Sequence, residues 1–287
     1  MLLGDAALRL GRPRLAQDLY KGGCKGHTPT PTDHTRLGLA EAGTVMSQKM
    51  LEVLGQVLEI SPNVFIGEGL ATWAKAAPFI EDERFMALAA KHARLLPVVN
   101  WHWNLQTVLS AAKQTLQVEG DFVELGVYRG HTTACLADYL EFQTRPKTWF
   151  LYDTFDGIPD DQLDEGWAEK NQSAYRGANT ATFEEVSGRF SAFPNIQVIQ
   201  GRVPEILAEP TTPDKIAFLH MDLNNATAEV AALDVLFDRI SPGGMIVFDD
   251  YGWTVSHRQR AAEDAWFAKR GLAIQPLPTG QGLFFKR

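Results

Sequence analysis

Five short apolar runs alternate with amphipathic segments after residue 120, and this alternation restricts the fold more than any other feature of the chain. Each run is almost continuously apolar, as expected for strands of a parallel sheet that helices cover on both faces. The segment between the fourth and fifth runs has the apolar spacing of a helix. We therefore expect a doubly wound α/β fold with a mostly parallel sheet. The predicted strands are residues 122–127, 149–153, 196–201, 216–222 and 244–250.

The C-terminal segment predicts how this sheet is completed. A helical pattern over residues 256–271 is followed by two short runs, 273–278 and 283–287, with the sequence Thr-Gly-Gln-Gly between them. A connection this short joins antiparallel strands. The two runs should form a hairpin at the sheet edge, so that the sheet has seven strands.

The part before residue 119 predicts helices. Residues 1–45 place small and apolar residues at helical spacing around a Gly-Arg-Pro turn, which resembles one tetratricopeptide unit or a plain helical extension. Arrays of such units need about three copies, and no second copy is evident. Residues 46–118 also have helical spacing and predict a helical cap, with breaks at Pro62, Pro78 and Pro97. The expected organisation is an extension (1–45), a cap (46–118) and an α/β domain (119–287).

Composition excludes several kinds of partner. The chain of 287 residues has a formal net charge of −8 and no Lys/Arg-rich stripe interleaved with aromatic residues, so nucleic acid and anionic membranes are not expected partners. Its two cysteines are too few for a disulfide framework and lack the paired spacing of a zinc site. No export signal or apolar run of about 20 residues is evident, so we expect a soluble cytoplasmic protein. The number of subunits stays open, a homo-oligomer included.

The end of the first predicted strand is suited to a nucleoside. Its glycines allow the backbone to approach a ligand, and the N-terminus of the helix predicted to begin near His131 favours a carboxylate. The E-x-G-x-x-x-G spacing differs from the G-x-G-x-x-G of dinucleotide-binding proteins, and this difference favours S-adenosylmethionine over NAD. A tight strand-to-helix turn without a ligand is the alternative. The candidate contacts are Glu124, Gly126, Tyr128, Arg129, Gly130 and Thr132.

Two further strand ends complete the predicted nucleoside site. In doubly wound sheets, ligands lie beyond the carboxyl ends of the strands, and a carboxylate that leaves the second strand accepts the ribose hydroxyls. Asp153 has this position, with Thr154 and Phe155 beside it. Gly201 and Arg202 end the third strand, where we expect the edge of the adenine. A surface arginine is the alternative for Arg202.

Carboxylates also end the fourth and fifth strands, at Asp222, Asp249 and Asp250. Neighbouring parallel strands bring them to one edge, where the charges repel one another unless a cation lies between them. Oxygen ligands suit Mg²⁺, which would grip two substrate oxygens and lower the pKa of the attacking hydroxyl. We expect all three to be metal ligands and Asp222 to be catalytic as well. A solvated strand end is the alternative for Asp249 and Asp250, and a helix N-cap is the alternative for Asn224.

A general base for the acceptor hydroxyl is expected at His257, because imidazole titrates near neutral pH and this residue follows the Asp-Asp-Tyr-Gly loop by about one helical turn. An exposed helix residue is the alternative. His220 lies two residues before Asp222, on the same side of the strand. The polar segment 160–182 predicts a lid or a disordered insert, whose Trp167 and Tyr175 would close over an acceptor or merely pack on the surface.

Four sequence blocks together resemble the macrocin O-methyltransferase (TylF-type) family: FVELGVYRGHTT, FLYDTFDGIPD, LHMDLN and SPGGMIVFDDYG. The resemblance covers about residues 120–252 and implies a class I methyltransferase with an antiparallel terminal strand, acting on a sugar hydroxyl with bound Mg²⁺. It implies Asp222, Asp249 and Asp250 as ligands, Glu124 and Gly126 at the methionine end and Asp153 at the ribose. The family's Asp-Gly-Asp, with Met or Leu and Tyr after it, is replaced here by the sequence Asp-Leu-Asn-Asn-Ala at 222–226, which leaves the substrate class open.

Two other functions are compatible with the same sequence. A degenerate methyltransferase fold with a helical extension would serve as a non-catalytic interaction module. Metal-dependent product formation would distinguish an enzyme from such a module. A nicotinamide-dependent oxidoreductase shares the general fold and the position of Asp153, but its glycine spacing differs. Titration with S-adenosylhomocysteine and with NAD distinguishes these two readings, because fold analogy alone does not fix function.

Overall fold

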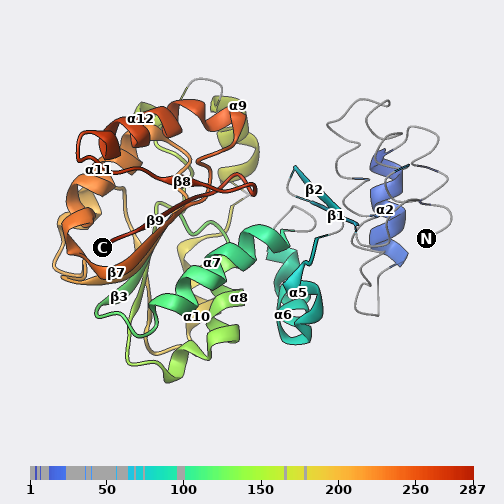
Figure 1. Cartoon of the computed structure of the whole chain (residues 1–287), viewed down its shortest axis with the longest axis horizontal. Coiled ribbons are helices and arrows are strands. Elements are labelled where there is room, and N and C mark those ends of the chain that lie inside the picture. Colours follow the sequence, from blue (N-terminus) through green and yellow to red (C-terminus); the bar gives the residue numbers. More distant parts are fainter. Residues whose placement is uncertain are drawn as a thin grey trace. The chain divides into compact units, whose positions relative to one another are not determined.

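The computed structural model of the chain (Figure 1) describes residues 4, 7, 13–23, 36, 40, 56, 64–67, 69–73, 75–95, 101–164, 167–177 and 180–287. The chain divides into two compact units, Met1–Gln106 and Thr107–Arg287. Most of the predicted N-terminal hairpin of helices lies outside the described residues, although its segment α2 (Pro13–Gly23) is helical. Among the described helices, none is both long and apolar enough to cross a bilayer.

The first unit contains a β-hairpin where the sequence pattern predicts helix. Strands β1 (Val64–Gly67) and β2 (Leu70–Trp73) pair antiparallel. The helical prediction is wrong here because β-branched and aromatic residues favour strands, and Gly69 takes the positive φ of +71° in the turn between them. Pro78 opens a helix instead of breaking one. The helical segments that follow are α5 (Pro78–Glu81), α6 (Glu83–His92), η1 (Ala93–Leu95) and α7 (His102–Thr115), which continues into the second unit.

The second unit carries all five predicted strands, each followed by helical structure. In the labels, η marks a short helical turn. The segments before the last two parallel strands are β3 (Asp121–Leu125), α8 (His131–Leu140), η2 (Phe142–Thr144), β4 (Trp149–Asp153), η3 (Asp160–Gln162), α9 (Ala168–Lys170), η4 (Asn171–Tyr175), α10 (Phe183–Phe190), β5 (Ile196–Gln200) and η6 (Glu205–Ala208). They are followed by β6 (Ile216–Met221), α11 (Ala226–Leu236), η7 (Phe237–Arg239), β7 (Ile240–Phe248), η8 (Thr254–Ser256), α12 (His257–Ala268), β8 (Gln275–Pro276) and β9 (Gly282–Phe285).

These strands form the predicted mostly parallel seven-stranded sheet, in the order β5-β4-β3-β6-β7-β9-β8. The five strands from β5 to β7 pair in parallel. The C-terminal hairpin is confirmed as well: β9 pairs antiparallel with β7, and β8 forms the edge. Helices α11 and α12 cover one face, whereas α8 and α10 lie on the other (Figure 1). The doubly wound α/β fold is therefore confirmed.

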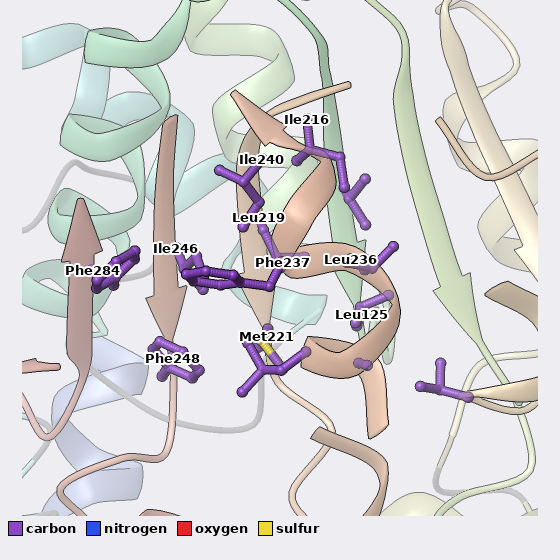
Figure 2. Packing of buried hydrophobic residues seen from close by; sticks show 14 of the residues in the cluster. Leu125, Ile216, Leu219, Met221, Leu236, Phe237, Ile240, Ile246, Phe248 and Phe284 are labelled. Carbon is purple, nitrogen blue, oxygen red and sulfur yellow. The ribbon is translucent and has the colours of Figure 1, made fainter. Parts of the chain in front are cut away.

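The main core lies between the sheet and helices α11 and α12. Alternate residues of β3 and β6, such as Val123, Leu125 and Met221, point into it because side chains alternate between the faces of a strand. Figure 2 shows side chains of β6, β7 and β9 meeting Leu236 and Phe237 from the end of α11 and from η7. Burial of each such side chain stabilises the fold by about 1.5–3 kcal/mol. This core fixes the strand ends relative to one another.

The opposite face of the sheet carries a second, aromatic cluster and one polar pair. The rings of Phe122, Trp149 and Phe218 pack edge to face, with Phe122 and Phe218 at 5.2 Å. One step further along, Glu124 of β3 stands directly beside His220 of β6. Both are almost fully buried, so this face becomes polar as it approaches the carboxyl ends of the strands.

Candidate functional site

The turn after β3 begins at Gly126, which is packed against the end of β6. Its φ is +84°, and a Cβ there would lie 1.9 Å from the carbonyl oxygen of Asp222. Gly130 has φ +72° and precedes α8, and a Cβ there would press on the ring of Phe190 at 2.9 Å. Both glycines are thus required by protein packing. The predicted start of a helix at His131 is confirmed.

Asp153, at the end of β4, holds this turn in place. One of its carboxylate oxygens accepts the N–H groups of Val127 (2.7 Å) and Tyr128 (2.8 Å), and the other accepts that of Phe155 (2.7 Å). Burial raises the pKa of Asp153, and these backbone hydrogen bonds oppose the rise. The carboxylate therefore fixes the turn. A carboxylate accepts about four hydrogen bonds, so Asp153 keeps capacity for a further donor.

Replacing Asp153 by Ala is expected to destabilise the protein by about 2–4 kcal/mol, because three backbone N–H groups would lose their acceptor in a buried place. Guanidinium denaturation measures this loss. Asp156→Ala, at an exposed position three residues later, should stay within about 0.5 kcal/mol of the parent. Equal midpoints for the two variants would show that the carboxylate does not hold the turn.

Three residues other than glycine adopt a positive φ just after strands at this edge of the sheet. They are Tyr128 after β3 (50°), Phe155 after β4 (54°) and Asn224 after β6 (58°). Such conformations cost about 1–3 kcal/mol for residues other than glycine and cluster at functional sites. The ring of Phe155 is buried and lies 5.8 Å from that of Phe183. Two of these strained residues, Tyr128 and Phe155, are predicted ligand contacts, and Asn224 follows the predicted metal ligand Asp222.

The remaining predicted nucleoside residues have mixed surroundings. Arg129 lies over the ring of Tyr128, 5.3 Å from its centroid, and Thr132 is half-buried in the first turn of α8. The hydroxyl of Thr154 donates to the carbonyl of Gly157 at 2.7 Å. Their side chains therefore line or support the turns after β3 and β4.

At the end of β5, Gly201 donates its N–H to the carbonyl of Asp153 at 2.9 Å. The guanidinium of Arg202 donates two hydrogen bonds to Asp161, at 2.6 and 3.0 Å. This pairing raises the pKa of Arg202 and lowers that of Asp161. The arginine thus ties the insert after β4 to β5.

A row of buried polar side chains runs across the sheet beneath the strand ends. Glu124 accepts a hydrogen bond from Thr133 of α8 and lies 3.1 Å from Nδ1 of His220. The other ring nitrogen of His220 lies 3.5 Å from Asp249, whose same oxygen accepts the Gln281 amide at 2.8 Å. Burial lowers the pKa of His220, but Asp249 and Glu124 outweigh it and raise the pKa to about 10. Glu124 is therefore part of a protein network, and Gln281 is a member that sequence patterns did not indicate.

Asp222 and the pair Asp249 and Asp250 follow the neighbouring strands β6 and β7 at this edge. The N–H of Asp222 donates to the carbonyl of Leu125, and that of Asp249 donates to the carbonyl of Met221. Burial raises the pKa of Asp222, and the charges of Asp249 and Asp250 raise it further. The carboxylates are thus close enough to repel one another.

These three acids do not form a ready-made metal cage. Among the residues that the structure describes, no three His, Cys, Asp or Glu side chains are grouped closely enough to hold an ion. One oxygen of Asp249 is turned to His220 and Gln281, and one oxygen of Asp222 accepts the Asn224 amide at 2.8 Å. The donor chemistry fits Mg²⁺, whereas the ligand geometry is not set in advance.

Asn224 is not the helix cap. The side chain of Asn225 accepts the N–H of Ala228 at 2.7 Å and caps α11. Asn224 instead donates to Asp222, and its positive φ leaves the cap position to the next residue. His257 is the first residue of α12 and is exposed, with its Nδ1 3.3 Å from the carbonyl of Thr254.

The insert after β4 is built from short helical turns, and its described residues 160–164, 167–177 and 180–182 are anchored at several points. Besides the ion pair of Asp161, Asp164 accepts the N–H of Ala226 at the start of α11 (3.0 Å). The amide of Asn171 both donates to and accepts from the backbone of Ile158. Such anchors hold the insert beside the strand ends.

Tyr175 is the residue of the insert that lies near the acids Asp222, Asp249 and Asp250. Its ring lies 5.6 Å from that of Tyr128 in an edge-to-face contact and 6.5 Å from that of Trp167 in a stacked one. Burial raises the pKa of its phenol, so the hydroxyl stays neutral. The charges that raise this pKa further include those of Asp222, Asp250 and Asp249. The aromatic side chain and the acids therefore face one region.

Comparison with known families identifies the family of the chain. The profile of the macrocin-O-methyltransferase (TylF) family matches residues 102–277, which include every strand of the large sheet except β9. The chain belongs to the macrocin-O-methyltransferase family. The motifs that carry the sequence resemblance all lie inside the matched range.

Curated relatives are similar to this chain over part of their length. The chain is 32% identical over 143 residues to demethyldecarbamoylnovobiocin O-methyltransferase of Streptomyces niveus, covering 47% of this chain and 53% of the relative. It is 29% identical over 161 residues to mycinamicin III 3''-O-methyltransferase of Micromonospora griseorubida, covering 52% and 61%. The chain thus spans about half to three fifths of the curated relatives it matches.

Solved structures support the fold. The O-methyltransferase NovP superposes with a TM-score of 0.54 at 20% identity, covering 71% of this chain and 97% of that one. A calicheamicin methyltransferase superposes with a TM-score of 0.51 at 18% identity, covering 74% and 94%. The TylF-family chain therefore has the Rossmann-like fold of methyltransferases, as the sequence predicts.

Proposed function

We propose that this protein transfers the methyl group of S-adenosylmethionine to a hydroxyl group of a small molecule, with Mg²⁺ at the acidic strand ends. The observation that supports this most directly is the juxtaposition at one sheet edge: a glycine turn fixed by Asp153 lies beside Asp222, whose neighbours are further acids. A nucleoside and an ionised acceptor need these two kinds of surroundings next to each other.

The residues around the turn fit the methyl donor. S-adenosylmethionine supplies a methyl group bound to a positively charged sulfur when it is present. The turn from Gly126 to Gly130 and the first residues of α8 would hold its methionine part, because a helix N-terminus favours a carboxylate. The spare hydrogen-bonding capacity of Asp153 would accept a ribose hydroxyl. Since Asp161 engages the guanidinium of Arg202, the backbone at Gly201 and Arg202 is the better candidate for the adenine edge.

A bound Mg²⁺ would be held by Asp222, Asp249 and Asp250 and would lower the pKa of an acceptor hydroxyl. The repulsion that raises the pKa of Asp222 is the reason why a cation fits there. Asp222 would also orient the acceptor. His257 is the proposed general base, since its exposed ring opens α12 shortly after Asp250 and its Nε2 is the nitrogen not directed at Thr254.

The acceptor is proposed to be a sugar hydroxyl of a glycosylated natural product. A third relative, 26% identical over 160 residues, is the 8-demethyl-8-(2,3-dimethoxy-α-L-rhamnosyl)-tetracenomycin-C 4'-O-methyltransferase of Streptomyces olivaceus. Tyr175, which the buried ring of Trp167 backs in a stacked contact, would offer an aromatic face to an acceptor at the acids. Stacking of a sugar on such a face would exclude water from the reacting oxygen.

S-adenosylhomocysteine is expected to raise the melting temperature of the protein, because a ligand that binds only the folded state stabilises it. At about 100 times its Kd the gain is about 2.7 kcal/mol. Thermal unfolding with and without the ligand measures it, and NAD at the same concentration is the control. A shift with NAD alone would support a nicotinamide-dependent oxidoreductase, and no shift with either at millimolar concentration would contradict the donor site. Binding without methyl transfer to any acceptor would favour the non-catalytic module.

A further inference from the structure

Glu229 of α11 and Glu263 of α12 form a buried acid pair behind the candidate site. Both side chains have 0% exposure, and each lies within hydrogen-bonding reach of the other. In the part of the chain that the structure describes, no Lys, Arg or His forms an ion pair with either of them. Two adjacent buried carboxylates without a counter-ion are costly, so the pair must be neutralised in another way.

The hydrogen-bond inventory of the pair indicates what is missing. Among the described residues, one oxygen of Glu229 and both oxygens of Glu263 are buried outside any regular hydrogen bond, although the carboxyl groups lie side by side and the amide of Gln259, itself without another partner, lies near Glu263. Ionised carboxylates only accept, whereas one protonated group donates to its neighbour. A single proton between the two groups therefore supplies the missing donor and removes one negative charge.

The surroundings of the pair favour keeping this proton. Burial and the neighbouring carboxyl group raise the pKa of Glu229, and Asp250 raises it further. On α12, Asp264 adds another negative charge near Glu263, whereas the amide of Gln259 opposes the rise in its pKa. The named charges that face the pair from these elements are thus acidic.

The acid pair also reaches the loop that carries Asp222. The second oxygen of Glu229 accepts the N–H of Leu223 at 3.1 Å. Leu223 lies between Asp222 and Asn224, whose positive φ of 58° turns the chain toward α11. We propose that Glu229 and Glu263 share one proton and that this protonated pair positions the loop 222–225 at the candidate site. The positioning role rests on the proposed function, whereas the shared proton does not.

The shared proton is tested through the pH dependence of stability. A carboxyl group whose pKa is raised in the folded state binds its proton more tightly there than in the unfolded chain. Its stabilising effect is therefore present at low pH and is lost as the pH rises above 4.5, the ordinary value for glutamate, through the folded-state pKa. Glu263→Gln supplies an N–H donor that does not titrate. It should reduce the proton uptake linked to folding by about one proton between about pH 5 and 8.

Denaturation midpoints of the ligand-free full chain, measured across this pH range, give the proton number. Glu184→Gln, which removes an exposed acid on α10, is the matched control and should leave the pH dependence unchanged. An unchanged pH dependence in Glu263→Gln would overturn the shared proton. So would a rise in stability with added K⁺ that the wild type shows and Glu263→Gln lacks, because a bound cation would then neutralise the pair.

The positioning role is tested by amide hydrogen exchange at Leu223. Glu229→Gln keeps an acceptor oxygen and should preserve protection, whereas Glu229→Leu should lower it about tenfold or more at this amide. Protection within α11 reports whether the helix itself remains folded. Equal protection at Leu223 in both variants, with α11 intact, would contradict the positioning role. Both experiments need neither methyl donor nor acceptor, so they can fail while the proposed methyl transfer holds.

Discussion

Replacing Asp222 by Asn is expected to stabilise the ligand-free protein and to abolish methyl transfer. Burial and the charges of Asp249 and Asp250 disfavour the ionised carboxylate, and a neutral amide of the same shape removes that repulsion. The amide still has an oxygen to accept the hydrogen bond from Asn224. A gain of about 0.5–2 kcal/mol is expected, as is usual where a functional residue is held at a cost in stability. Guanidinium denaturation without ligands measures it.

The same substitution should remove the response to Mg²⁺. We expect Mg²⁺ to raise the melting temperature of the wild type and to leave that of Asp222→Asn unchanged, because the remaining acids hold the ion more weakly. Formation of S-adenosylhomocysteine with a panel of glycosylated acceptors should fall about 100-fold or more. Asp156→Asn, at an exposed site in the turn after β4, is the matched control.

His257→Ala separates the base from the metal in the same assay. It should lower turnover by about 100-fold while the response to Mg²⁺ persists, because the ring acts on the acceptor proton alone. Undiminished turnover in Asp222→Asn, with the Mg²⁺ response retained, would remove the metal from the mechanism. Undiminished turnover in His257→Ala would mean that solvent or another group, and not His257, removes the proton of the acceptor hydroxyl.

The architecture of the second unit follows from local patterns. Nearly continuous apolar runs predict buried parallel strands, and all five strands are confirmed. Strands β3, β4, β6 and β7 are almost fully buried, whereas β5 at the sheet edge is only partly covered. The short Thr-Gly-Gln-Gly connection likewise predicts the C-terminal hairpin. The hairpin at residues 64–73 was not predicted. Its strands have four residues each, which is too short for an alternating pattern to be told from helical spacing.

The candidate site is only partly contained in the sequence. Strand ends predict which residues meet, so the proximity of Asp222, Asp249 and Asp250 was accessible from the order of the runs. What each side chain contacts was not. Gln281 reaches Asp249 from the hairpin, and Arg202 turns to Asp161 in the insert, because tertiary hydrogen bonds between distant segments leave no periodic signal. The buried pair of Glu229 and Glu263 is hidden for the same reason: acids at helical positions ordinarily face solvent.

Gly126→Ala is expected to cause the largest loss of stability among Gly→Ala changes in the part of the chain that the structure describes. The new Cβ would lie 1.9 Å from the carbonyl oxygen of Asp222. That oxygen belongs to the backbone and cannot turn away as a side chain would, so β3 and β6 would have to separate. The φ of +84° adds strain, at about 1–2 kcal/mol for a residue with a side chain. The sum should exceed about 4 kcal/mol, a size that single substitutions reach only through such defects.

Two other glycines separate the clash from the strain in Gly126→Ala. Gly177→Ala meets no atom within 4 Å but keeps a positive φ of +60°, so it should show the strain alone. Gly188→Ala meets no atom either, lies inside α10 with an ordinary helical φ, and should gain up to about 1 kcal/mol. Guanidinium denaturation of the three variants gives the comparison. Because the clash joins the turn after β3 to the loop that carries Asp222, a variant of Gly126 no less stable than that of Gly177 would mean that the two halves of the site are not in contact.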